Sequence, residues 1–149
     1  EICDAVIAAR PRSPLDFDAR VRALIGFLAL PESASLTAAN KRITNLLKKS
    51  AGGESGADRI DVSLLKVDAE RALYASLQNV AHVVPRAIEG GDYAAAFTSL
   101  AGLRGVVDAF FDGVMVMDPD PALRNNRLAL LASLHSLFAG IADLSRLPG

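Results

Sequence analysis

The hydrophobic positions of this chain follow the period of amphipathic α-helices. Apolar residues recur at i, i+3, i+4 and i+7, the spacing of a helix that turns one face into a core. This pattern, interrupted by proline, glycine and capping residues, predicts helices over 2–10, 14–30, 33–50, 61–89, 93–104, 106–117 and 121–147. Since 61–89 is expected to be only mainly helical and to be kinked or split near Pro85, the last helix is expected to be the longest. The chain is therefore expected to be all-α, a single-domain helical bundle of about five to seven helices.

Local signals mark where some of these helices begin and where one is disturbed. Ser13 and Asp16 have the three-residue spacing of a capping box, with a hydroxyl at the N-cap and a carboxylate at N3. Asp120 is placed as an N-cap and Pro121 as the first helical residue, where a missing N–H costs nothing. Pro85, inside an otherwise helical segment, predicts a kink or a split just before it.

The length of 149 residues is that of one ordinary domain. The chain opens inside a predicted helix and without an initiating methionine, so we expect residues 1–149 to be one domain of a longer chain. Residues 51–58, AGGESGAD, are rich in glycine and serine and are predicted to form a mobile loop.

One charge falls on the apolar stripe of the last predicted helix. Arg127 lies within about 60° of the centre of that stripe, as set by the helical period. A buried guanidinium needs a partner, and Asp108 and Asp112 stand one turn apart on the preceding helix. We predict an internal ion pair between Arg127 and these carboxylates, with Arg124 sharing them. A metal site on the same carboxylates would need His, Glu or Asp ligands that this region lacks.

The charge balance restricts any nucleic-acid surface to a local one. The net charge is −1, with 16 basic and 17 acidic residues, whereas proteins held mainly by phosphate contacts are usually basic. No acidic residue occurs between 33 and 50, and the polar side of that predicted helix carries Lys41, Arg42, Asn45, Lys48 and Lys49. This face is a candidate RNA-binding surface, or else a solvated lysine-rich surface. Arg10 and Arg12 form a possible second patch.

Candidates for other contacts with RNA are few. Tyr74, Tyr93 and Phe97 are the aromatic residues considered for stacking on an unpaired base, although their spacing also suits a core. Met115 and Met117 are flexible apolar residues that could line a pocket.

The sequence carries no recognisable catalytic or cofactor-binding motif. It has no phosphate-cradling glycine loop, no Ser-His-Asp set and no synthetase catalytic signature. Its lone cysteine, Cys3, fits a reducing compartment, and no apolar run approaches the length of a membrane span. We therefore expect no catalytic site, metal or cofactor in these residues, no membrane contact, and a cytoplasmic location.

Three blocks of sequence carry a family resemblance. Residues 110–131 read FFDGVMVMDPDPALRNNRLALL, residues 38–46 read AANKRITNL, and residues 141–145 read IADLS. Together they resemble the DALR helical anticodon-binding domain of arginyl-type class I synthetases. They are still more similar to the version at the C-terminus of the beta subunit of bacterial heterotetrameric glycyl-tRNA synthetases. The resemblance covers nearly the whole chain.

The resemblance implies a function that composition alone does not. The domain would bind the anticodon arm of glycine tRNA and position it for glycylation by the alpha subunit. Its partners would be glycine tRNA, the rest of the beta subunit and the alpha subunit. The alternative is an all-α protein-interaction or assembly module without direct RNA contact, which the near-neutral net charge favours slightly.

Overall fold

The computed structural model describes residues 1–50 and 60–148, and every regular element in that part of the chain is helical. The α-helices are α1 (Ile2–Ala8), α2 (Pro14–Leu28), α3 (Ser33–Ser50), α4 (Asp68–Glu89), α5 (Tyr93–Ala101), α6 (Arg104–Gly113) and α7 (Pro121–Ala139). Two 3₁₀ turns, η1 (Val62–Leu64) and η2 (Leu144–Arg146), complete the set. The all-α prediction is confirmed, whereas the mobile loop predicted over 51–58 lies outside the described residues.

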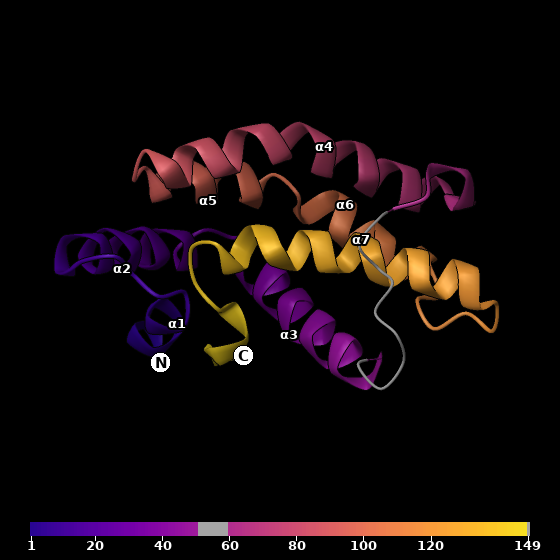
Figure 1. The fold of residues 1–149 in the computed structure, drawn as a ribbon, viewed down its shortest axis with the longest axis horizontal. Coiled ribbons are helices and arrows are strands. Elements are labelled where there is room, and N and C mark those ends of the chain that lie inside the picture. The colour runs from indigo at the N-terminus through magenta and orange to yellow at the C-terminus, as the bar shows by residue number, and fades with distance from the viewer. Residues whose placement is uncertain (51–59, 149) are drawn as a thin grey trace.

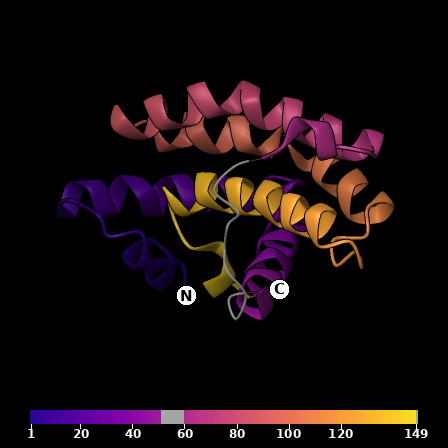
Figure 2. The ribbon, with the colours of Figure 1, turned by 45° about the vertical axis from the view of Figure 1, so that its right-hand side comes forward.

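The helices pack in layers around α7. Helix α4 lies along one side of the molecule over α5 and α6, while α2 and α7 run through the middle (Figure 1). Helix α3 crosses beneath α7 and also contacts α6 and η2. The turned view keeps α4 and α3 on opposite sides of the bundle (Figure 2). Helices α2 and α3 meet at 111°, which directs α3 away from the α2 axis.

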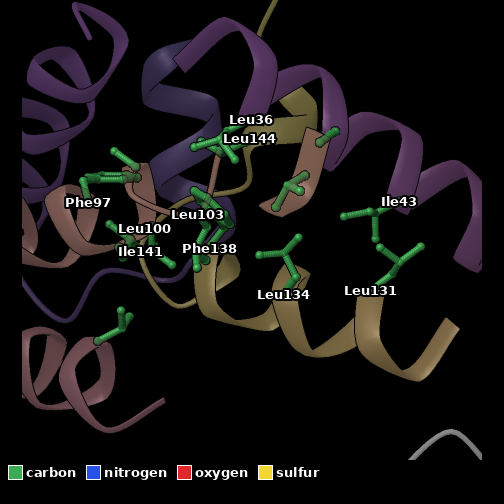
Figure 3. Close-up of a cluster of buried hydrophobic side chains, with 14 of the residues drawn as sticks. Leu36, Ile43, Phe97, Leu100, Leu103, Leu131, Leu134, Phe138, Ile141 and Leu144 are labelled. Atoms are coloured by element: carbon green, nitrogen blue, oxygen red, sulfur yellow. The ribbon is translucent and has the colours of Figure 1, made fainter. Parts of the chain in front are cut away.

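The core between these layers is built from leucine and phenylalanine. Ile43 of α3 lies beside Leu131 of α7, whereas Leu36 of α3 lies beside Leu144 in η2 (Figure 3). The spacing of these residues on their helices is what the hydrophobic pattern requires of a shared face. Burial of one face of α3 against α7 leaves its opposite face toward solvent.

Aromatic rings join this core to α2 and α5. Phe27 of α2 stacks on Phe97 of α5 with ring centroids 4.7 Å apart, and Phe138 of α7 lies 6.2 Å from Phe27 at a tilt. Each of these rings is almost fully buried. Offset and tilted pairs of this kind add stability beyond the area that they bury.

The predicted end of the last helix is wrong, because the chain leaves the helical path earlier. Helix α7 ends at Ala139, and α4, with 22 residues, is longer than α7, with 19. After Gly140 the chain turns back, and the N–H of Asp143 donates to the carbonyl oxygen of Ala5 in α1 at 2.8 Å. Leu144 is buried as its spacing indicated, but it lies in η2 rather than in a continuing helix.

Other helix bounds also differ from the sequence expectation. Helix α4 begins at Asp68 rather than at residue 61, and α6 ends at Gly113 rather than at residue 117. Helix α4 continues through Pro85, which sits exposed near the helix C-terminus. Ala81, whose carbonyl loses its helical donor to Pro85, is also exposed, so water can replace that hydrogen bond. The break between α5 and α6 falls at Gly102 and Leu103, and Gly105 lies inside the first turn of α6.

Asp16 is the point at which α2 is joined to its surroundings. The Ser13 hydroxyl oxygen accepts a hydrogen bond from the Asp16 N–H at 3.1 Å, which confirms the predicted N-cap. The Asp16 carboxylate accepts from the Arg12 N–H at 2.9 Å, from Arg20 Nε at 3.0 Å and from the Tyr93 hydroxyl. One carboxylate therefore ties the start of α2 to its second turn and to the first residue of α5.

Arg20 extends this network to the C-terminal segment. Its side chain is buried, and Nη1 donates to the carbonyl oxygens of Gly140 at 2.9 Å and Ile141 at 3.0 Å. Its guanidinium carbon also lies 4.6 Å from the centre of the Tyr93 ring. These acceptors belong to the C-cap residue of α7 and the residue after it, so Arg20 fixes the chain where it leaves the helix.

The carboxyl group of Asp16 should be unusually acidic. Burial alone would raise its pKa, but hydrogen bonds from Tyr93, from the Arg12 N–H and from Arg20 lower the pKa from 3.8 to about 2. Because the folded-state pKa lies below the unfolded value, the ionised carboxylate stabilises the fold above pH 4. That stabilisation is lost as the pH falls from 4 toward 2.

We predict that Tyr93→Phe raises the pKa of Asp16, because it removes the hydrogen bond that lowers this pKa most. A ¹³C NMR titration of the side-chain carboxyls measures this shift directly. The Asp16→Asn variant should be less stable than the original chain at pH 7, with a smaller gap at pH 2. A gap that stayed constant across that range would contradict the network.

Candidate nucleic-acid interface

Arg127 is buried and paired, but with partners other than those predicted. Its Nη2 donates to Glu70 Oε1 at 3.2 Å, and the two side chains are only 5% and 0% exposed. Its Nη1 donates to the carbonyl oxygen of Met115 at 2.6 Å and lies 3.4 Å from Asp118 Oδ2. Arg124 was predicted to share Asp108 and Asp112, but its Nη1 donates instead to the carbonyl oxygen of Asp118 at 3.2 Å. The guanidinium thus joins α7 to α4 and to the turn before α7.

The prediction that Asp108 and Asp112 pair with Arg127 is wrong. Asp108 accepts a hydrogen bond from Ser35 Oγ of α3 at 2.5 Å and lies 3.5 Å from Arg104 Nε in an ion pair. Asp112 is exposed and forms no ion pair with any described residue. Both carboxylates lie on sides of α6 that do not face the buried guanidinium. The helical period of α7 places Arg127 on the apolar stripe but does not show which side of α6 faces it.

A second charge on an apolar stripe could have identified the true partner. Glu70 stands at helical spacing with Leu73, Leu77 and Val84, all of them buried in α4. A carboxylate on one apolar stripe and a guanidinium on another predict a buried pair, although the two residues are 57 positions apart. Glu70 Oε1 also accepts from the Val67 N–H at 3.1 Å, which caps α4.

Asn126, beside Arg127 in the conspicuous motif, is also structural. Its Oδ1 accepts from the Asp61 N–H at 2.7 Å, and its Nδ2 donates to the Asp61 carbonyl oxygen at 3.0 Å. An amide side chain that satisfies both backbone groups of one residue fixes that segment against α7. The most recognisable part of the sequence therefore holds the fold rather than presenting groups to a ligand.

We predict that Arg127→Ala lowers the free energy of unfolding by about 3 kcal/mol or more, the usual cost of leaving a buried charge unpaired. Arg124→Ala is the matched control, since Arg124 is half-buried and makes one long hydrogen bond. Urea denaturation of both variants measures the difference. Equal and small losses for the two arginines would show that the buried pair does not stabilise the fold.

The outward face of α3 presents the candidate RNA-binding residues. The structure leaves Arg42, Asn45, Lys48 and Lys49 exposed and Lys41 half-buried. The opposite side of the helix is closed by buried residues, among them Leu36 and Ile43. Lys48 and Lys49 form no ion pair with a carboxylate of residues 1–50 or 60–148. The geometry thus keeps the face outward, and its role in RNA binding stays a prediction.

Arg42 is held differently from the lysines. Its guanidinium carbon lies 4.4 Å from the centre of the Phe111 ring, on the neighbouring helix α6. Phe111 is half-buried and meets the buried Phe110 edge-on, with ring centroids 5.6 Å apart. The guanidinium is therefore positioned by a ring that is itself anchored in the core.

The second basic patch is not continuous with the first. Arg10 and Arg12 lie in the connection between α1 and α2, which Figures 1 and 2 both place away from the C-terminal end of α3. Both side chains are exposed. A groove of about 330 Å³ opens beside this connection, lined by Arg12, Arg20, Val84, Pro85, Ile88, Glu89, Ser136 and Leu137.

Two of the three aromatic candidates for base stacking are wrong. Tyr93 and Phe97 are only 2% exposed and belong to the core, while Tyr74 is half-buried against it. The spacing of these residues in the sequence was also compatible with a place in the core. Met115 and Met117 do reach the surface, at 65% and 47% exposed. They lie in the turn before α7, which Arg127 binds through the carbonyl oxygen of Met115.

The part of the chain that the structure describes bears on two other possible roles, metal binding and membrane insertion. There, no three His, Cys, Asp or Glu side chains gather in a group that could hold a metal ion. No single helix of residues 1–50 and 60–148 is long and apolar enough to cross a bilayer. Only bent pairs, α2 with α3 and α5 with α6, reach that length and composition together.

Comparison with known proteins places the chain among anticodon-binding domains. The DALR anticodon binding domain family matches residues 36–144, which include α3 except its first three residues and the whole of α7. The chain is 52% identical to the glycine–tRNA ligase beta subunit of Marinobacter nauticus over 148 residues, 99% of this chain and 21% of that protein. It is 51% identical over 149 residues to the beta subunit of Acinetobacter baumannii, covering 100% of this chain and 21% of that protein.

A third relative, the glycine–tRNA ligase beta subunit of Vibrio cholerae, is 50% identical over 147 residues, again 99% of this chain and 21% of the relative. The chain thus spans about a fifth of the length of the curated relatives that it matches.

Proposed function

This chain belongs to the DALR anticodon binding domain family, and we propose that it binds the anticodon arm of glycine tRNA as part of a glycine–tRNA ligase beta subunit. In this role it would position the tRNA while the alpha subunit carries out glycylation. The observation that carries the proposal is the outward face of α3, which is basic, free of acidic residues and inside the matched range.

The electrostatics of the domain are those of a local and weak RNA site. With a net charge of −1, the domain as a whole does not attract a polyanion. Lys48 and Lys49, in the last turn of α3, are placed to contact phosphates. Asn45, one turn before Lys49, can hydrogen-bond to a sugar or a base edge. Linkage to the remaining tRNA contacts of a larger protein would raise the effective concentration of the RNA.

Protein partners form the second part of the proposal. We propose that the remainder of the beta subunit and the alpha subunit contact this domain in the cytoplasm. Ile7, Leu15 and Ile25, on α1 and α2, are large apolar residues left more than half exposed. They favour a contact with protein at α1 or α2 and keep open the alternative of an assembly module without direct RNA contact.

Binding of glycine tRNA at two salt concentrations separates these functions. Contacts with about four phosphates should weaken the affinity several-fold when the monovalent salt concentration doubles, through counterion release. Fluorescence anisotropy of labelled tRNA measures the change. Undetectable or salt-independent binding, together with retained subunit association, would support the assembly module.

Lys48 and Lys49 should be the main source of that salt dependence. We predict that Lys48→Gln with Lys49→Gln weakens tRNA binding and lowers the slope of log affinity against log salt by roughly 1 to 2, while thermal stability stays nearly unchanged. The control replaces Lys66, which precedes α4, and Arg86, which lies in α4, by glutamine; both residues are exposed. If both double variants behave alike, the α3 face is not the phosphate-binding surface.

A further inference from the structure

On the α3 face, the Arg42 side chain is supported by an aromatic ring, that of Phe111. The guanidinium lies over the aromatic ring at 4.4 Å, and the ring is fixed by its edge-on contact with buried Phe110. One side of the guanidinium group is therefore occupied by the ring. Arg42 as a whole remains exposed, so a base can approach the guanidinium from solvent.

Carboxylates are close in sequence to this ring, yet they do not neutralise Arg42. Asp108 is engaged by Ser35 and Arg104. Asp112, directly after Phe111, forms no ion pair with Arg42 or with any other residue that the structure describes. The guanidinium thus keeps its full charge and its outward N–H donors, while its orientation is set by the ring.

We propose that Arg42, supported by Phe111, is a stacking platform for an unpaired base of the RNA, an inference that rests on the function proposed above. Unpaired bases in single-stranded RNA stack on aromatic rings and on arginine guanidinium planes. A base on the free face would complete a stack of base, guanidinium and phenyl ring. The N–H donors at the edge of the guanidinium would remain available for a neighbouring phosphate or base edge.

The position of Arg42 on α3 matches this role. Lys48 and Lys49 follow it by six and seven residues, which corresponds to about 9 and 10.5 Å along the helix at 1.5 Å per residue. That distance is about three stacked nucleotides at roughly 3.4 Å per step. One strand could therefore place a base on Arg42 and phosphates on the two lysines. The anticodon loop offers unpaired bases and phosphates in such proximity.

The structure also restricts where else a base could stack. Tyr93 and Phe97 are buried, so neither ring has a face for RNA. Phe111 is itself half-buried and covered by Arg42 on one side. On α5 and α6, these aromatic rings are therefore not freely available to RNA. Next to the α3 face, a base can stack on the guanidinium of Arg42 instead.

The test compares Arg42→Lys with Arg86→Lys in the full-length natural protein that contains this sequence. Both substitutions keep the charge and remove a planar guanidinium, but Arg86 lies on α4, on the opposite side of the bundle from α3. The probes are the anticodon stem-loop of glycine tRNA, with 2-aminopurine replacing one loop base at a time, and a fully paired RNA hairpin. Binding affinity, salt slope and 2-aminopurine fluorescence are recorded for each protein.

Arg42→Lys is expected to weaken stem-loop binding roughly fivefold or more, the loss that one stacked base represents. The salt slope should stay unchanged because the charge remains, and the fluorescence change at one loop position should disappear. Affinity for the paired hairpin and all values for Arg86→Lys should match those of the natural protein. Phe111→Leu, which keeps an apolar side chain beneath Arg42, should reproduce part of the stem-loop loss without a large drop in melting temperature.

The outcomes separate failure of this inference from failure of the proposed function. If the natural protein binds neither the stem-loop nor intact tRNA, the proposed function fails, and the stacking role with it. If it binds and Arg42→Lys is unchanged, or loses affinity equally for the paired hairpin, the stacking role alone is wrong. Loss of subunit association with unchanged RNA binding would likewise overturn it, by assigning Arg42 to a protein contact.

Discussion

The pairing of one buried guanidinium constrains the half of the molecule on which the functional account depends. Arg127 of α7 joins Glu70 of α4 and the backbone of Met115 in the turn between α6 and α7. Neither charge can be left alone in the core without a large loss of stability. The pair therefore fixes α7 relative to α4, and α7 is the helix against which α3 packs.

From that constraint follows the direction in which α3 faces. One side of the helix is apolar and packs on α7 through residues such as Ile43, so the lysine-bearing side must face outward. The acid-free composition of α3 keeps that side positively charged, although the whole chain is nearly neutral. Carboxylates on the neighbouring α6 do not cancel the charge. Asp108 is held by Ser35 and Arg104 instead.

Features governed by neighbours in sequence were predictable, and those governed by distant contacts were not. The helices and the caps at Ser13 and Asp120 follow from local spacing and short side-chain-to-backbone hydrogen bonds, and all are present. The partner of Arg127 was missed because Glu70 comes from a helix far away in sequence. The end of α7 was missed because the apolar spacing continues past Gly140, where the buried Arg20 donates to the carbonyl oxygens of Gly140 and Ile141.

The candidate site likewise has one part that the sequence of a single helix could predict and another that depends on contacts between helices. The basic face of α3 is a property of one helix, so its composition could be read directly, whereas the Arg42–Phe111 stack depends on how α6 lies beside α3. Residues 110–131, which carry the family resemblance, mainly stabilise the fold. Asn126 and Arg127 within them are both buried and bonded inside the domain. A family signature therefore need not coincide with the residues that meet the ligand.

A structure of the full-length protein bound to glycine tRNA, determined by cryo-electron microscopy, would test the central claim most directly. The account predicts that the outward face of α3 lies against the anticodon arm, with Lys48 and Lys49 within hydrogen-bonding distance of phosphate oxygens. An α3 face covered by protein, or facing solvent while the anticodon arm contacts another surface, would contradict it.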